Sequence, residues 1–141
     1  MEAIVDAKNL RISRKKSYEV CNLIRNKTTK KAKMILNRVI NMEQAVPYKK
    51  YLADTPHRPG KIAAGRYPIK TCEEILKIIE SGEANARNKG MNENLIISHI
   101  SSHKAPKQFH YGSKRRTIMK NAHIKLILRE LNKDVKKEDK K

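Results

Sequence analysis

The sequence predicts an α+β fold, and three observations support this prediction. Three stretches repeat apolar residues at the spacing of an amphipathic helix. Two apolar runs, 95–100 and 123–129, have the character of strands, and the second alternates apolar and basic residues. The chain between these runs is basic, and no Asp or Glu occurs from Asn94 to Arg129. Two strands with such a connection indicate a β-hairpin whose basic arm projects from the domain.

Length and charge narrow the class of protein. The 141 residues suit one domain, which we place at 1–131 with a charged tail at 132–141. The 33 Lys and Arg against 14 Asp and Glu give a net charge of +19, which needs a negative partner to screen it. Nucleic acid is the usual partner, and an anionic membrane surface is the alternative. No stretch approaches the roughly 20 apolar residues of a spanning helix, and Asp6 and Lys8 interrupt any signal-peptide pattern.

The pattern of residues in the N-terminal third of the chain predicts a short strand at 3–7 followed by two helices. Ser13 is the expected N-cap of the first helix, which runs to about Asn26. Its core-facing residues are Val20, Leu23 and Ile24. Its first turn, 14–16, carries three cations next to the positive end of the helix dipole, which is unfavourable. Phosphates nearby would offset that cost, and a solvated basic turn is the alternative.

Two further helices follow at the same apolar spacing. Thr28 or Thr29 caps the second helix. One face of this helix carries Ala32, Ile35, Leu36 and Val39. The third helix begins after Pro68 and ends before Gly90, the expected C-terminal cap. One face of this helix is apolar except at Glu83, and it carries Cys72, Ile75, Leu76, Ile79, Glu83 and Ala86. Gly82 weakens this helix, since Gly costs about 1 kcal/mol relative to Ala.

Residues 41–68, here called the middle loop, carry five prolines and glycines besides Pro68 and predict irregular structure. Five cations alternate along it with Tyr48, Tyr51 and Tyr67. Cations interleaved with aromatic rings are typical of contacts with RNA backbone and bases. His57 has no second ligand at metal spacing, so we expect it to contact RNA or solvent.

The connection at 101–122, here called the arm, is too long for a tight turn and has few groups to build a core. Pro106 suits a bulge or an edge, and Gly112 suits a chain reversal. We expect the arm to become ordered on RNA, with Phe109 and Tyr111 stacking on bases or packing between riboses. The alternative is a disordered, solvated loop.

The sequence contains no catalytic constellation, so we expect no enzyme and no cofactor. It lacks the GxGxxG, GxxxxGK[ST], GxSxG and HExxH motifs. Most of the few carboxylates are expected on helix faces next to lysines, where exposed ion pairs are the ordinary explanation. Ser98 to His103 lie on a predicted strand, where side chains alternate faces and do not converge. Cys21 and Cys72 stand alone and predict two buried, reduced thiols of an intracellular protein, without a disulfide or a metal site.

Several motifs together resemble a known family, the universal ribosomal large-subunit proteins numbered twenty-two, or seventeen in the eukaryotic scheme. The most specific match is the run from Pro56 to Lys70, PHRPGKIAAGRYPIK, which resembles the long loop of archaeal members. The run Glu83 to Ala86 with Lys89-Gly90 resembles the end of the family's Ala-Asn-Ala helix. Shorter matches are Ile12-Ser13, Leu23-Ile24-Arg25, Val46-Pro47-Tyr48, Ser98-His99-Ile100 and Ala105-Pro106-Lys107-Gln108. The resemblance covers roughly 4–130, and the long loop implies the archaeal and eukaryotic branch.

The resemblance implies three helices packed on a small antiparallel three-stranded sheet with a projecting basic hairpin. It also implies that the protein is a structural constituent of the large ribosomal subunit in the cytoplasm. In that role the protein would bind and organise ribosomal RNA. The hairpin would extend toward the nascent-peptide exit tunnel. The implied partners are large-subunit ribosomal RNA, neighbouring large-subunit proteins and the nascent chain, without a membrane. The alternative is a free basic nucleic-acid-binding protein outside the ribosome.

Two departures from the family concern the arm and the C-terminus. The family's Arg-Ala-x-Gly-Arg run near the tip is replaced by Tyr111-Gly112-Ser113-Lys114-Arg115-Arg116, and the arm is shorter. Against the eukaryotic pattern we also expect the C-terminal extension to be largely missing, and a reduced eukaryotic ribosome would explain both departures.

The residues expected to bind ribosomal RNA are basic. They are Lys8, Arg11, Arg14, Lys15, Lys16, Arg25, Lys27, Lys49, Lys50, Arg58, Lys61, Arg66, Lys70, Arg87, Lys104, Lys107 and Lys120. Those expected at the hairpin tip, nearest the tunnel, are Phe109, His110, Tyr111, Gly112, Ser113, Lys114, Arg115 and Arg116.

Overall fold

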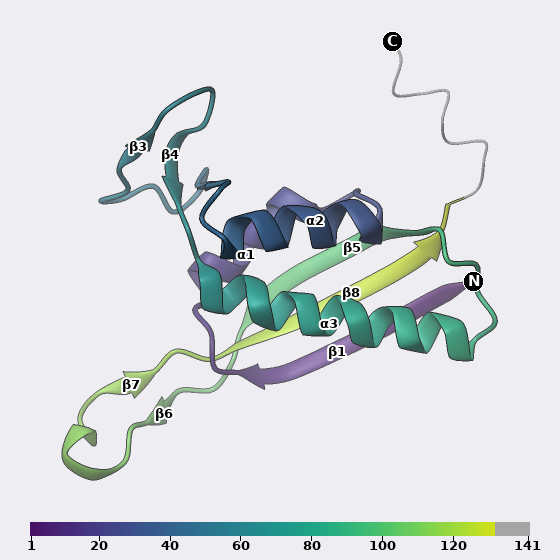
Figure 1. Ribbon diagram of the computed structural model, residues 1–141. Helices are drawn as coiled ribbons and strands as arrows, with labels where there is room; N and C mark the ends of the chain where they lie inside the picture. Colours follow the sequence, from purple (N-terminus) through teal and green to yellow (C-terminus); the bar gives the residue numbers. More distant parts are fainter. Residues whose placement is uncertain (132–141) are drawn as a thin grey trace.

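Three helices cover one face of a three-stranded antiparallel sheet in the computed structural model, which describes residues 1–131 (Figure 1). The sheet consists of β1 (Glu2–Leu10), β5 (Leu95–Lys104) and β8 (Ala122–Glu130), with β8 in the middle. Both neighbours run antiparallel to β8. The predicted α+β class is confirmed. The tail predicted at 132–141 lies outside the described residues.

The central strand β8 buries one of its faces completely. Ile124, Leu126 and Leu128 are fully buried, whereas Lys125 and Arg129 are exposed, as the alternation in the sequence predicts. Strand β1 is longer than the predicted 3–7. It pairs with β8 from Glu2 opposite Arg129 to Leu10 opposite Ala122. Interstrand hydrogen bonds therefore extend β1 into residues whose composition alone does not indicate a strand.

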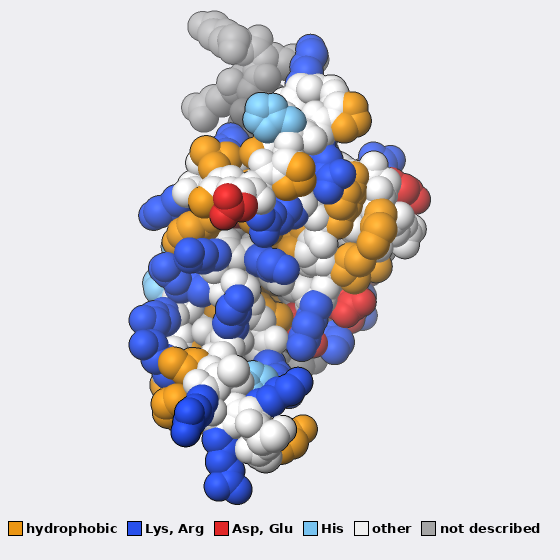
Figure 2. Space-filling model, turned by 90° about the vertical axis from the view of Figure 1, so that its left-hand side faces the viewer, with side chains coloured by type: hydrophobic (Ala, Val, Ile, Leu, Met, Phe, Trp, Pro, Cys, Tyr) orange, Lys and Arg blue, Asp and Glu red, His pale blue; other side chains and the backbone are white. Residues whose placement is uncertain are grey.

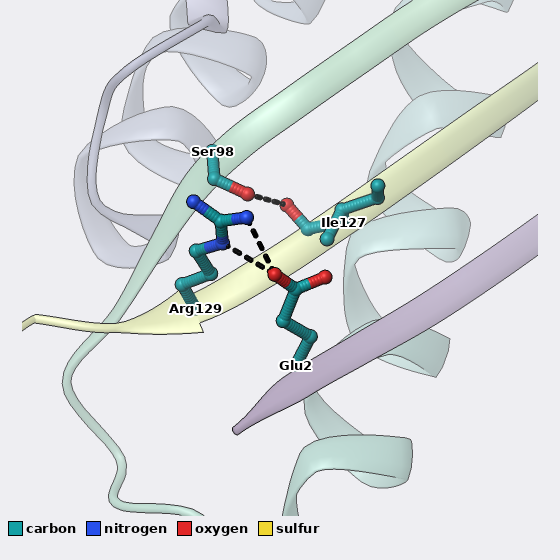
Figure 3. A network of polar contacts seen from close by, with 4 residues as sticks. All are labelled: Glu2, Ser98, Ile127 and Arg129. Carbon is teal, nitrogen blue, oxygen red and sulfur yellow. Dashed lines mark hydrogen bonds and ion pairs between the residues drawn. The ribbon is translucent and has the colours of Figure 1, made fainter.

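The edge strand β5 contains an irregularity that the sequence does not reveal. Its register with β8 shifts between Ile97 and His99, so the simple alternation expected for this strand is wrong there. The hydroxyl of Ser98 donates to the carbonyl oxygen of Ile127 at 3.0 Å. Figure 3 shows this bond beside the Glu2–Arg129 ion pair, on the sheet face turned away from the helices. Both side chains of the pair are substantially exposed, so it contributes little stability.

The helices are α1 (Arg14–Ile24), α2 (Thr29–Ile40) and α3 (Ile69–Asn88). Helix α1 ends at Ile24, two residues before the predicted Asn26, because Arg25 already has a non-helical ψ of 142°. Thr28 caps α2 by accepting a bond from the amide of Lys31 at 3.4 Å.

Helix α3 ends at the predicted glycine. Gly90 has a φ of +71°, and its amide donates to the carbonyl oxygen of Arg87. The amide of Met91 donates to the carbonyl oxygen of Ala86. These two bonds form a Schellman motif, which satisfies carbonyls at the helix end. Met91 is buried, so the motif also turns an apolar side chain into the core.

The middle loop contains a small sheet, so the expectation of irregular structure is wrong for a few of its residues. Strands β2 (Val46–Pro47), β4 (Ala63–Arg66) and β3 (His57–Arg58) pair in that order. Gly65 permits the close approach: a Cβ at this position would lie 3.1 to 3.3 Å from Arg58, Ala45 and Ile62 side chains. Pairing between these short strands gives the middle loop a defined structure, which the intrinsic strand propensity of its residues does not predict.

The arm leaves the sheet as a narrow hairpin (Figure 1). Strands β6 (Gln108–Phe109) and β7 (Ile118–Met119) pair within it, and a 3-10 turn, η1 (Gly112–Lys114), lies at its tip. Gly112 has a φ of +65°, in agreement with the predicted chain reversal. Pro106 lies in the unpaired segment between β5 and β6, where its missing amide proton breaks no ladder bond.

Candidate nucleic-acid interface

Three adjoining hollows lie where the first turn of α1 faces the base of the arm and the middle loop. Their volumes are about 310, 400 and 410 Å³, and Ser13 and Lys120 line all three. We call this continuous depression the basic groove. The cations that line it are Arg11, Arg14, Lys15, Lys16, Lys50, Arg66, Lys70, Lys104, Lys107 and Lys120.

The charge of the basic groove is almost entirely positive. Ten cations line it, whereas Asp54 is the one acidic residue of its lining among residues 1–131. Figure 2 shows this end of the molecule, on which Lys and Arg side chains predominate and acidic side chains are few. Charges of one sign in a concave surface concentrate the field, so the groove attracts a polyanion.

The start of α1 adds to this positive potential. Ser13 occupies the N-cap position, as predicted, but its side chain makes no capping hydrogen bond. The first turn holds no acidic residue either. The amide groups of the first turn thus lack a side-chain acceptor, and a helix start in this state is suited to binding phosphate oxygens.

The tyrosines beside the groove hold cations in position. The guanidinium of Arg14 and the ammonium of Lys15 lie 5.9 and 5.6 Å from the centre of the Tyr51 ring. The Tyr18 ring meets Tyr51 edge to face at 5.7 Å, and the ammonium of Lys50 lies 5.1 Å from the centre of Tyr18. These distances are within the range of cation–π attraction.

This arrangement changes the role expected for the tyrosines of the middle loop. Arg58 lies over the Tyr67 ring at 5.1 Å, and Tyr48 is buried. The rings of Tyr51 and Tyr67 therefore contact cations and that of Tyr48 packs in the core, although the sequence suggested contacts with RNA backbone and bases. By contrast, Phe109 and Tyr111 on the arm are 64% and 82% exposed, so their ring faces are open to stacking.

A buried carboxylate underlies the groove. Glu19 on α1 is 1% exposed, and its side chain accepts hydrogen bonds from the amides of Lys49, Lys50 and Tyr51 at 3.2, 2.9 and 2.9 Å. Glu19 is therefore an exception to the expectation that most carboxylates lie on exposed helix faces. The sequence offers one signal, because Glu19 is the only acid in a helix that opens with three cations.

Seven of the predicted RNA-binding cations do not line the groove. They are Lys8, Arg25, Lys27, Lys49, Arg58, Lys61 and Arg87. Two of them have structural contacts: Arg25 donates to the carbonyl of Ile100 at 3.2 Å, and Arg58 donates to that of Gly65 at 3.2 Å. These two side chains brace the fold, which sequence spacing could not indicate.

The tip residues project beyond the groove, with one exception. His110 is half-buried and lines the hollow that also contains Arg11 and Lys70. Residues 111–116 are exposed, and the hydroxyl of Thr117 donates to the carbonyl of Lys114 at 2.7 Å, which closes the turn. The three successive cations 114–116 are therefore held exposed by a defined turn.

Neither thiol is placed for chemistry. Cys21 and Cys72 are free and buried, as predicted. Burial raises the pKa of each thiol to about 12, so both remain protonated and unreactive at neutral pH. Within residues 1–131, no three His, Cys, Asp or Glu side chains gather as metal ligands, and no helix is long and apolar enough to cross a membrane.

Comparison with known proteins shows which family this chain is similar to. The family described as "Ribosomal protein L22p/L17e" matches residues 5–129. Two archaeal proteins named "Large ribosomal subunit protein uL22", from Methanococcus vannielii and Methanococcus aeolicus, are each 41% identical over 133 residues, covering 87% of this chain and 86% of the relative. The protein of that name from Methanopyrus kandleri is 40% identical over 135 residues, covering 87% and 83%.

Proposed function

The chain belongs to the ribosomal protein L22p/L17e family, and from this premise we propose that its basic groove and arm bind large-subunit ribosomal RNA. The family is structural and non-enzymatic, and its archaeal members place this chain in the archaeal and eukaryotic branch. The proposed role is to hold segments of ribosomal RNA together in the cytosolic large subunit. Neighbouring large-subunit proteins complete its set of proposed partners.

The observation that carries this proposal is the charge of the basic groove. Ten cations line it against one acid, and they come from the β1–α1 connection, α1, the arm, the middle loop and the start of α3. A phosphate backbone in the groove releases counterions as each of its charges is neutralised. Because the cations come from separate elements, the groove fits a folded RNA surface and recognises shape, and does not read a base sequence.

The arm is proposed to pass between RNA segments, with its tip at 109–116 directed toward the peptide exit tunnel and the nascent chain. Its exposed Phe109 and Tyr111, together with the acid-free run from Asn94 to Arg129, support this placement. The predicted cations outside the groove, apart from Arg25 and Arg58, are proposed to meet further phosphates. Residues 1–131 would thus act as one RNA-binding unit.

The salt dependence of RNA binding tests the proposal. The probe is a large-subunit ribosomal RNA transcript from Methanococcus vannielii, the source of a 41% identical relative. Changing Lys15, Lys16 and Lys120 together to Ala should lower the slope of log K against log salt by about 2 to 3, at about 0.7 to 0.9 per lost phosphate contact. A matched variant with Lys31, Lys77 and Lys125 changed to Ala loses the same charge outside the groove. Equal slopes for the two variants would contradict a role for the groove.

The arm is tested separately. Changing Lys114, Arg115 and Arg116 together to Ala should also lower the slope, because these exposed cations are proposed to neutralise phosphates. An unchanged slope would show that they face solvent in the complex.

The competing function is that of a free basic nucleic-acid-binding protein. Sucrose-gradient fractionation of cell extracts at high salt separates the two. Recovery only with large subunits agrees with the ribosomal role, and a soluble pool agrees with the competing one.

A further inference from the structure

We infer that Glu19 is a positioning residue of the basic groove: it docks residues 49–51 of the middle loop onto α1 and so places the groove's cations before RNA arrives. The inference rests on the proposed RNA-binding function. It concerns a buried acidic side chain beneath a predominantly basic surface.

The hydrogen bonds of Glu19 show that its charge is held specifically. One carboxylate oxygen accepts the amides of Lys50 and Tyr51, and the other accepts the amide of Lys49. A buried charge is costly unless it is paired or well hydrogen-bonded. Three successive amides aimed at one carboxylate compensate this cost, much as a backbone nest binds an anion. The burial of Glu19 therefore depends on the docked conformation of 49–51, and that conformation depends on Glu19.

The docked segment carries the parts of the groove that face α1. Tyr51 packs against Tyr18, and its ring lies beside Arg14 and Lys15 of the first helical turn. Lys50 lies over the Tyr18 ring and lines the same 410 Å³ hollow as Tyr51 and Lys15. Releasing 49–51 would free these cations from their aromatic neighbours. Glu19 thus acts on RNA through the loop, without touching RNA itself.

The consequence for binding follows from population arithmetic. When only a fraction of molecules has the binding-competent conformation, the apparent affinity falls by that fraction. If loss of the carboxylate leaves the segment docked in about one molecule in ten, RNA affinity falls about tenfold. The contacts in the final complex stay the same, so the salt slope does not change.

The sign of the effect distinguishes positioning from simple charge. Removing a negative charge from an RNA-binding surface strengthens attraction to phosphate if nothing else changes. If Glu19 positions the loop, removing its charge weakens binding instead. Glu19→Gln keeps the size of the side chain, but its amide nitrogen would face the amide donor of one loop residue. The matched control is Glu80→Gln, which removes the same charge from an exposed position on α3.

The experiment measures binding of the full chain to the ribosomal RNA transcript over a range of salt concentrations. We expect Glu19→Gln to weaken Kd about tenfold with an unchanged slope, and Glu80→Gln to leave Kd equal or slightly tighter. Circular dichroism first establishes that both variants are folded at the assay temperature. If folded Glu19→Gln binds as tightly as the wild type, the inference is wrong while the proposed function stands. If the wild type shows no salt-dependent binding, the proposed function fails and the inference fails with it.

A second measurement needs no variant, so it decides the question even if Glu19→Gln does not fold. Hydrogen exchange of the RNA-free wild type reports directly on the amides of Lys49, Lys50 and Tyr51. We expect them to exchange slowly, at rates comparable to the amide of Tyr48, which bonds to the carbonyl of Ala64 at 2.9 Å. Unprotected exchange at all three amides would show that the segment is not docked before RNA binds, which overturns the inference.

Discussion

Substituting Gly82 by Ala tests how closely α3 packs on the sheet. Gly82 is buried within α3 and faces the sheet. A Cβ at this position would lie 2.9 Å from Leu128 Cδ1, 3.2 Å from Leu126 Cδ2 and 3.5 Å from Val5 Cγ2. Real Cβ atoms essentially never have a neighbour closer than 3.0 Å, so the leucine side chains or the helix must shift.

Two opposing effects determine how much Gly82→Ala changes the free energy of unfolding. Replacing Gly by Ala within a helix stabilises it by about 1 kcal/mol. Overpacking a tight core costs about 1 to 3 kcal/mol. Leu126 and Leu128 are both fully buried, which leaves their methyl groups little room to move. We therefore expect the free energy of unfolding to fall by about 1 kcal/mol, the middle of the resulting range of about 0 to 2.

Urea denaturation followed by circular dichroism measures this change. The control is Ser81→Ala, which changes the neighbouring, exposed residue and should raise the free energy of unfolding by up to about 0.5 kcal/mol. A Gly82→Ala protein that is about 1 kcal/mol more stable than the wild type would refute the argument. It would mean that the helix and sheet separate without cost and that Gly82 is not required by packing.

Two other predictions concern pH and helix capping. Burial raises the pKa of Cys21 and Cys72 from 9.0 and of Tyr48 from 10.0 to about 12 in each case. The folded state keeps these three protons at pH values where the unfolded state loses them. These groups should therefore lower the free energy of unfolding progressively from about pH 9 toward pH 12, and urea curves without this loss would contradict the prediction. Thr28→Ala should cost about 0.5 to 1 kcal/mol in urea because the Thr28 hydroxyl caps α2. Ser13→Ala should cost less, since that hydroxyl makes no capping bond, and equal losses would contradict this difference.

The sequence by itself determined the elements whose signals are local. The period of apolar residues located the three helices, and the alternation in 123–129 identified the buried face of β8. Gly90 marked the end of α3 because a left-handed backbone conformation there favours glycine. The acid-free run through the arm indicated a polyanionic partner, since net charge acts at long range and needs no knowledge of the fold.

Only the tertiary structure decided which side chains meet. The cations of the basic groove come from distant parts of the chain, and no spacing in the sequence joins Lys15 to Lys120. Glu19 lies 30 to 32 residues from the amides that bind it, so its burial could not be read from its neighbours in the helix. Gly82 likewise resembled a weak point in α3, and only its distances to the leucines of β8 showed that a larger residue would force a shift in packing. Hydrogen bonding and close packing depend on distances in space, and folding sets these distances between residues far apart along the chain.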